Sequence, residues 1–79
     1  MKKEYKSNDL YQAVALKTAG FPLIRLERNS GRFFDFIFED SENKAEEILT
    51  QFWAKKLQVD AKEFVENINE LKARVNSGI

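Results

Sequence analysis

The chain contains no cysteine and no histidine, and it has only one proline and three glycines. Without cysteine it can form no disulfide and no thiolate metal site. Without histidine it lacks the commonest general base and the commonest metal ligand, and its serines have no histidine or cysteine to complete a dyad; no lysine–serine spacing recommends that alternative. We therefore predict that the protein is not an enzyme, with no catalytic residues, no metal and no cofactor.

The chain also lacks net charge and long apolar runs. Thirteen basic residues balance thirteen acidic ones, so the broad basic surface of a typical nucleic-acid-binding protein is not expected. No apolar run approaches the roughly 20 residues that span a bilayer, and the N-terminal lysines are not followed by a signal-peptide core. These absences predict no membrane partner. They favour a cytoplasmic location, which the absence of cysteine also fits.

What the sequence does contain is enough apolar material for one small core. Hydrophobic residues make up 43% of the 79 residues, and seven of them are phenylalanine. A single domain over residues 1–79 is expected, burying only about 60–65% of its unfolded surface. A core this thin, without disulfides or metal, needs efficient packing or a partner chain.

Residues 23–38 predict a β-hairpin around the turn signal Asn29-Ser30-Gly31. A three-residue loop there would place Arg28 opposite Arg32, Glu27 opposite Phe33, Leu26 opposite Phe34, Arg25 opposite Asp35 and Ile24 opposite Phe36. In that register one strongly apolar face faces the core; it consists of Ile24, Leu26, Phe34, Phe36 and Phe38. The second face mixes the Arg25–Asp35 pair with Leu23, Phe33 and Ile37.

The first helix is expected at about residues 8–19. Ser7, Asn8 and Asp9 supply N-cap side chains, and Gly20 is suited to the left-handed residue that ends a helix. Phe21 can then fold back on the last turn, as in a Schellman motif.

Two more helices follow the hairpin. One is expected at about residues 41–56, with Asp40 or Ser41 as N-cap, and the acidic residues nearby are interpreted as a helix start, not as a calcium loop. The other begins at Asp60, where Glu63 completes a capping-box variant and a hydrophobic staple is expected at the same turn. Their short connection predicts an αα-hairpin of antiparallel neighbours.

The predicted fold class is therefore α+β, with the order helix, β-hairpin, αα-hairpin (α-β-β-α-α) packed as helices on a ribbon. Tyr5 is a candidate for a short additional N-terminal strand.

Several motifs together resemble a known family. They are Tyr5-Lys6-Ser7, Leu10-Tyr11-x-Ala13, Gly20-Phe21, Phe36-x-Phe38-Glu39-Asp40-Ser41, Phe52-Trp53 and Val59-Asp60-Ala61. The pattern is similar to that of small single-domain proteins of unknown function from bacteria and their viruses. The resemblance covers nearly the whole chain and implies a small cytoplasmic protein linked to phages or mobile elements. It brings no catalytic or ligand residues with it.

The hairpin tip is the one candidate anion or nucleic-acid contact, through Arg28, Asn29 and Arg32. Arginine clusters suit phosphates, and a two-stranded ribbon can enter a major groove. A nucleic-acid-associated accessory protein is therefore the alternative function. The neutral chain charge favours a simple solvated turn.

A protein partner, most simply a second copy in a symmetric dimer, is the preferred hypothesis. The candidate interface residues are Leu23, Phe33 and Ile37 on the second hairpin face, together with Trp53. Tryptophan is enriched in interface hot spots, although the simpler interpretation is that Trp53 caps the core against the last helix. The second hairpin face is covered either by the chain's own helices or by another chain.

Overall fold

The computed structural model describes residues 3–30 and 33–77; the side chains of residues 29, 30 and 33 are outside the description. The elements in order are β1 (Glu4–Ser7), α1 (Leu10–Thr18), β2 (Leu23–Ser30), β3 (Phe33–Glu39), α2 (Ala45–Trp53) and α3 (Ala61–Ser77). The α+β class and the order of elements are confirmed. Tyr5 does lie in a short N-terminal strand.

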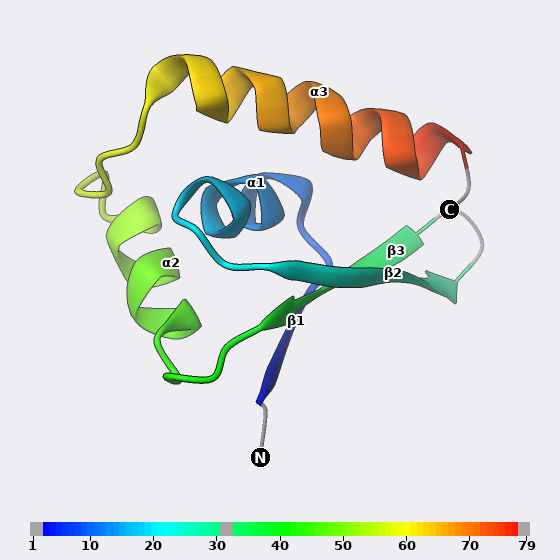
Figure 1. The fold of residues 1–79 in the computed structure, drawn as a ribbon, viewed down its shortest axis with the longest axis horizontal. Helices are drawn as coiled ribbons and strands as arrows, with labels where there is room; N and C mark the ends of the chain where they lie inside the picture. The colour runs from blue at the N-terminus through cyan, green and yellow to red at the C-terminus, as the bar shows by residue number, and fades with distance from the viewer. Residues whose placement is uncertain (1–2, 31–32, 78–79) are drawn as a thin grey trace.

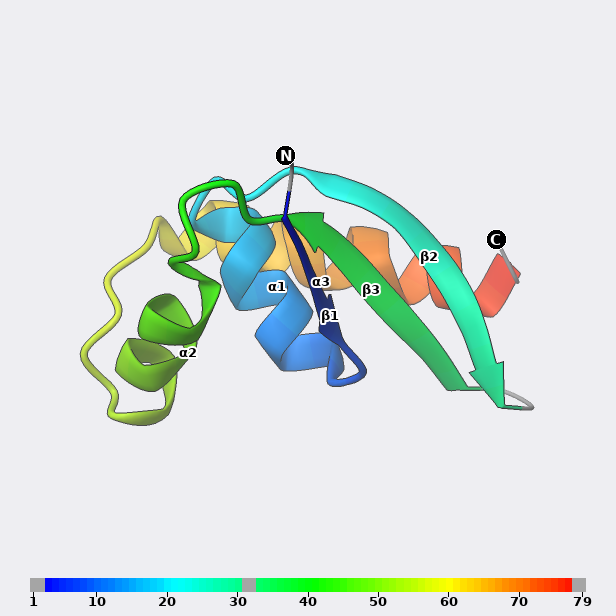
Figure 2. The ribbon, with the colours of Figure 1, turned by 90° about the horizontal axis from the view of Figure 1, so that it is seen from below.

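The three strands form one antiparallel sheet in the order β1-β3-β2, so the aromatic strand β3 is central. Helices α1 and α3 lie on one face of this sheet, and α2 flanks α1 at the end (Figure 1). Seen from below, the strands cross in front of α1 and α3 (Figure 2). The sheet therefore has one covered face and one open face.

The predicted hairpin register is wrong by two residues. Leu26 lies opposite Phe36 and Arg25 opposite Ile37, because β2 continues to Ser30 and pairs it with Phe33. A bulge between Arg28 and Ser30 absorbs the extra length. The predicted loop residue Gly31 lies outside the described residues.

An even shift keeps each side chain on its predicted face, whereas a shift by one would reverse the faces. Leu26, Phe36 and Phe38 therefore still point to the core. A second bulge, between Leu23 and Arg25, corrects the assignment of two residues. It turns Leu23 toward the core and leaves Ile24 on the surface.

The helix α1 is the centre of the molecule. Four consecutive residues, Ala13 to Leu16, are fully buried, so the middle of the helix is enclosed on every side. It packs against β1 of the sheet and against α2 and α3, while α2 and α3 make few contacts with each other. The predicted αα-hairpin is therefore wrong as a packing unit: both helices dock on α1 instead.

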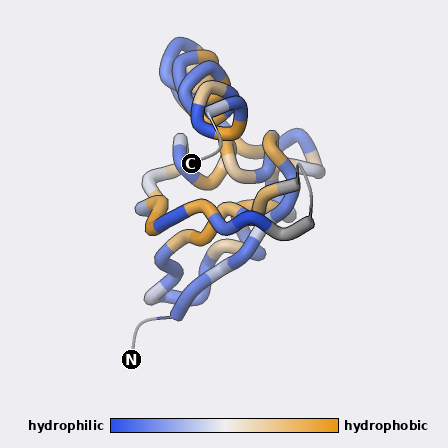
Figure 3. Tube along the Cα trace, turned by 90° about the vertical axis from the view of Figure 1, so that its right-hand side faces the viewer, coloured by the Kyte–Doolittle hydropathy of each residue, from blue (hydrophilic) through white to orange (hydrophobic). Residues whose placement is uncertain are grey.

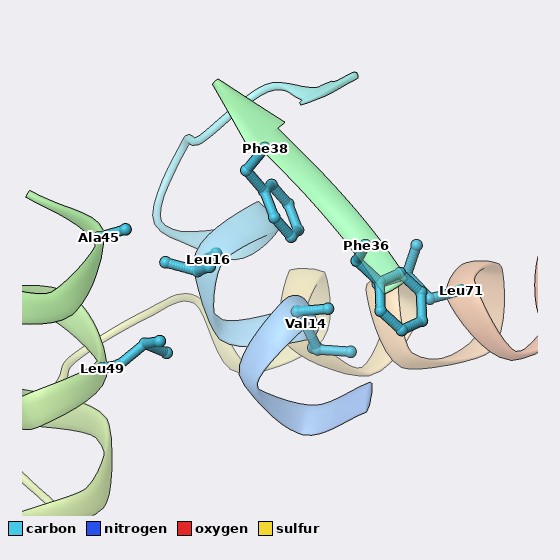
Figure 4. Close-up of a cluster of buried hydrophobic side chains, with 8 residues drawn as sticks. Val14, Leu16, Phe36, Phe38, Ala45, Leu49 and Leu71 are labelled. Atoms are coloured by element: carbon cyan, nitrogen blue, oxygen red, sulfur yellow. The ribbon is translucent and has the colours of Figure 1, made fainter. Parts of the chain in front are cut away.

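The core is assembled from every layer around α1. Figure 4 shows side chains from β3, α2 and α3 converging on Val14 and Leu16. The buried cluster comprises Ala13, Val14, Leu16, Phe36, Phe38, Ala45, Leu49 and Leu71. Hydrophobic segments gather in the middle of the molecule and α3 is largely hydrophilic on its outer side (Figure 3).

Local caps follow the sequence closely. The Asp9 carboxylate accepts from the amides of Tyr11 and Gln12, at 2.8 and 3.0 Å. Gly20 has φ of 105°, and the amides of Gly20 and Phe21 donate to Lys17 and Leu16, which is the Schellman pattern. Each of these end signals is confirmed.

The helix α3 begins with a cap too. The Asp60 carboxylate accepts from the Glu63 amide at 2.7 Å, as the capping box predicts. By contrast, α2 starts at Ala45, four residues later than expected. A turn containing Asn43 at φ 58° lies between Asp40 and the helix.

Candidate interaction surfaces

The open face of the sheet carries a network of ion pairs. Arg25 on β2 donates to both oxygens of Glu4 on β1, at 3.1 and 3.2 Å, and to Glu27 at 2.7 Å. Between them lies Ile37, whose cross-strand neighbours are Lys6 and Arg25. Ile37 is only 1% exposed. Long charged side chains thus cover an apolar residue with their stems while their charges stay in water.

The same network offsets a repulsive pair. Glu27 and Asp35 lie directly opposite each other in the ladder, an arrangement that is unfavourable for like charges. The Lys6 ammonium lies 3.9 Å from Glu27 and 4.0 Å from Asp35. It therefore bridges the two carboxylates.

The ion pair between Glu4 and Arg25 predicts a pH-dependent contribution to folding stability. Hydrogen bonds from Arg25 lower the pKa of Glu4 from its ordinary value of 4.5. The folded state therefore favours the carboxylate, so this contribution is complete above pH 4.5 and is lost as pH falls through the lower, folded pKa. Glu4→Gln should be less stable than wild type at neutral pH, and the gap should close in acid.

Urea unfolding of both proteins across this pH range measures the gap. Glu66→Gln, an exposed change on α3, is the matched control and should give a nearly constant difference. A difference for Glu4→Gln that does not depend on pH would contradict the assignment.

The predicted interface residues do not form one surface. Leu23 packs against the core cluster and Ile37 is buried beneath the ion pairs, so neither is presented to a partner. The predicted apolar face of Leu23, Phe33 and Ile37 is corrected accordingly. The side chain of Phe33 lies outside the described residues. Of the four, Trp53 is exposed, at 60% of its surface.

Sequence reasoning missed an apolar groove lined by Phe52, the chain neighbour of Trp53; Trp53 itself lines a different cavity, with Tyr5, Gln12, Glu46, Leu49 and Thr50. The Trp53 ring contacts Phe52 edge-on, with 5.1 Å between the centroids, and Phe52 lines a cavity of about 530 Å³ between the end of α2 and the start of α3. Val65 on the rim is 54% exposed. The lining residues are Phe52, Lys55, Leu57, Gln58, Val59, Ala61, Phe64 and Val65.

The groove exists because α2 and α3 diverge. Had they packed as an αα-hairpin, their apolar stripes would have covered each other. Instead, Lys55 adopts φ of 63° and the chain turns away to residue 60 before α3 begins. The apolar pattern Leu57-x-Val59, in a connection that should be polar, was the available sequence signal, and both side chains are half-buried.

At the hairpin tip the structure describes one of the two arginines. The Arg28 guanidinium lies 5.0 Å from the centre of the Phe34 ring, a cation–π contact that holds it against β3. Arg32 and the side chain of Asn29 lie outside the described residues. The facing Arg28–Arg32 pair is replaced by Arg28 opposite Phe34. The nucleic-acid hypothesis stays a prediction.

Within residues 3–30 and 33–77 there is no group of three or more acidic side chains arranged to hold a metal ion. In the same residues no helix is both long and apolar enough to cross a membrane.

These features define a class of protein: a small α+β domain with a three-stranded antiparallel sheet, one face of which carries helices. The chain belongs to the family described as a domain of unknown function (DUF5659), whose model matches residues 2–77. No curated protein and no solved structure matches it.

Proposed function

We propose that this protein is a small, non-enzymatic protein-interaction module that also self-associates. The observation that carries the proposal is the exposed Trp53 ring, which contacts Phe52, a residue lining the apolar groove. Because most of the Trp53 side chain is in solvent, its burial adds little to the stability of the chain's own fold. Contiguous exposed apolar surface on a small domain marks an interaction site, and tryptophan is the residue most enriched in hot spots.

The composition of the groove suits a protein segment. It is lined mainly by aliphatic and aromatic side chains, with Lys55 and Gln58 as its polar groups. Interfaces combine an apolar centre with a polar rim in this way. An apolar side chain of a partner would fill the cavity, and Trp53 would pack over its backbone.

The absence of enzymatic activity is part of the same proposal. Several hydroxyl groups already hold backbone positions: Thr18 donates to Val14, Thr50 to Glu46 and Ser77 to Arg74. Ser7 bonds to Gln12 beside the start of α1. Such hydroxyls support a structural role, since an activated nucleophile requires an adjacent base.

Selection from a displayed random-peptide library tests the groove. The wild-type protein should enrich peptides with an apolar anchor. Their affinity for Trp53→Ala should fall about 30-fold, the loss expected for a hot spot of about 2 kcal/mol. Because Trp53 is the single tryptophan, its emission should shift to shorter wavelength when such a peptide binds.

Tyr11→Ala is the matched control, since Tyr11 is also an exposed aromatic residue but lies on α1. It should bind the selected peptides like wild type. Peptides that bind Trp53→Ala equally well, or a selection that enriches nothing, would overturn the proposal for this surface.

A further inference from the structure

Strand β2 forms an outer edge of the sheet. Its inner side pairs with β3, and in the described part of the chain no element lies along its outer side (Figures 1 and 2). In an antiparallel ladder, the residues whose amide and carbonyl groups do not bond the neighbour point them outward. The edge of β2 therefore presents backbone groups that another strand could pair with.

Only a short stretch of this edge is regular. Bulges lie between Leu23 and Arg25 and between Arg28 and Ser30, so the uninterrupted stretch is Arg25 to Arg28. Its side chains alternate strictly. Arg25 and Glu27 lie on the open face, while Leu26 shares the covered face with its partner Phe36.

Two copies of this stretch can pair about a two-fold axis in very few ways. Directly opposite residues of an antiparallel ladder point to the same face of the sheet. The two-fold axis must therefore pass midway between one residue and the same residue of the second copy, which is called here an axis through that residue. An axis through Arg25, Glu27 or Arg28 places that charged residue opposite its own copy, which is repulsive. An axis through Leu26 places Leu26 against Leu26 and each Arg25 opposite the other copy's Glu27.

We propose that β2 pairs with β2 of a second copy about an axis through Leu26, which joins the two sheets into one continuous antiparallel sheet. This inference rests on the proposed self-association and specifies where it occurs. Charge complementarity supports it: each copy places one positive and one negative side chain on the open face, two residues apart. Under the axis these become two opposite-charge pairs across the interface.

The pairing leaves the Arg25–Glu4 ion pair and the groove between α2 and α3 intact. Arg25 keeps Glu4 as a partner on the side away from the edge, because β1 lies beyond β3. The groove belongs to α2 and α3, so a dimer formed at β2 would present two grooves.

Charge-reversed variants test the pairing in trans. Arg25→Glu alone would place two acidic side chains opposite each other across the axis, and Glu27→Arg alone would place two basic ones there. Each variant by itself should associate about tenfold more weakly than wild type or worse. Mixed together, one chain carries acidic side chains at both positions and the other carries basic ones, so every opposing pair attracts. The mixture should recover dimer mass in sedimentation analysis.

Two controls separate the interface from the fold. Glu4→Lys breaks the Arg25–Glu4 ion pair, as Arg25→Glu does, but the substituted residue lies on β1, away from the proposed interface. The mass of its dimer should therefore be unchanged. The double variant Arg25→Glu, Glu27→Arg restores opposite charges across the axis and should dimerise by itself. Circular dichroism checks that all variants are folded.

The outcomes are distinct. Wild-type protein that stays at the mass of one chain from micromolar to millimolar concentration would overturn self-association and this pairing together. A wild-type dimer that neither single variant weakens would overturn the β2 pairing while self-association stands. Single variants that weaken the dimer without recovery on mixing would also overturn the pairing.

Discussion

Phe38→Ala is expected to remove most of the stability of the fold. Phe38 is completely buried in the central strand, with Tyr5 opposite it on one side and Leu23 on the other. Truncating a buried phenylalanine costs about 3–5 kcal/mol, because transfer free energy is lost and a cavity remains. A domain of this length has a total stability of roughly 4–12 kcal/mol. The variant should therefore be partly or wholly unfolded.

Urea unfolding followed by circular dichroism measures this loss. Phe38→Leu keeps most of the volume and should cost clearly less. Val65→Ala, an exposed truncation on α3, should change stability by no more than about 0.5 kcal/mol. A loss below about 1 kcal/mol for Phe38→Ala would mean that β3 is not the centre of the core.

The second large effect is expected at Asp40, which bonds to Lys3 beside β1, to the turn at Asn43 and to the start of α2. Its side chain is 3% exposed, and Oδ1 accepts from the amides of Lys44 at 2.8 Å and Ala45 at 3.2 Å. Its own amide donates to the Lys3 carbonyl at 2.7 Å, and its carbonyl accepts from Asn43. Asp40 thus links the β1 side of the sheet to the start of α2.

Asp40→Ala should cost roughly 2–3 kcal/mol, because the Lys44 amide and the buried Ala45 amide both lose their acceptor. Asp40→Asn keeps an oxygen in the same place and should cost about 1 kcal/mol or less. Chemical unfolding gives the totals, and amide hydrogen exchange should show the Ala45 amide opening first in the alanine variant.

Asp60→Ala provides the comparison, since Asp60 caps α3 from an exposed position with the Glu63 amide alone. It should cost about 1 kcal/mol. Equal losses for the alanine and asparagine changes at Asp40 would show that charge, and not the acceptor oxygen, stabilises the start of α2.

The local parts of this fold could be predicted from the sequence. The caps at Asp9 and Asp60 and the helix end at Gly20 depend on side chains and backbone angles within a few residues, so nearby sequence contains the whole signal. The alternation of apolar residues likewise identified both strands of the hairpin and its core face, except at Leu23 and Ile24.

The candidate interface was predicted less well. Trp53 is exposed and does not cap the core, whereas Ile37 is buried beneath Lys6 and Arg25. Those covering side chains come from strands on either side of Ile37. One sequence does not show which strands become neighbours, so an apolar residue on the second face looked uncovered.

The sequence by itself determined which elements form, where the capped helices α1 and α3 begin, which residues are apolar enough for the core, and which chemistry is missing. Tertiary structure alone decided the rest. Two bulges set the register of β2, α1 became the enclosed centre, and the divergence of α2 and α3 opened the groove lined by Phe52. The physical reason is that each of these results from competition among packing arrangements of the whole chain, whereas caps and turns are settled within a few residues.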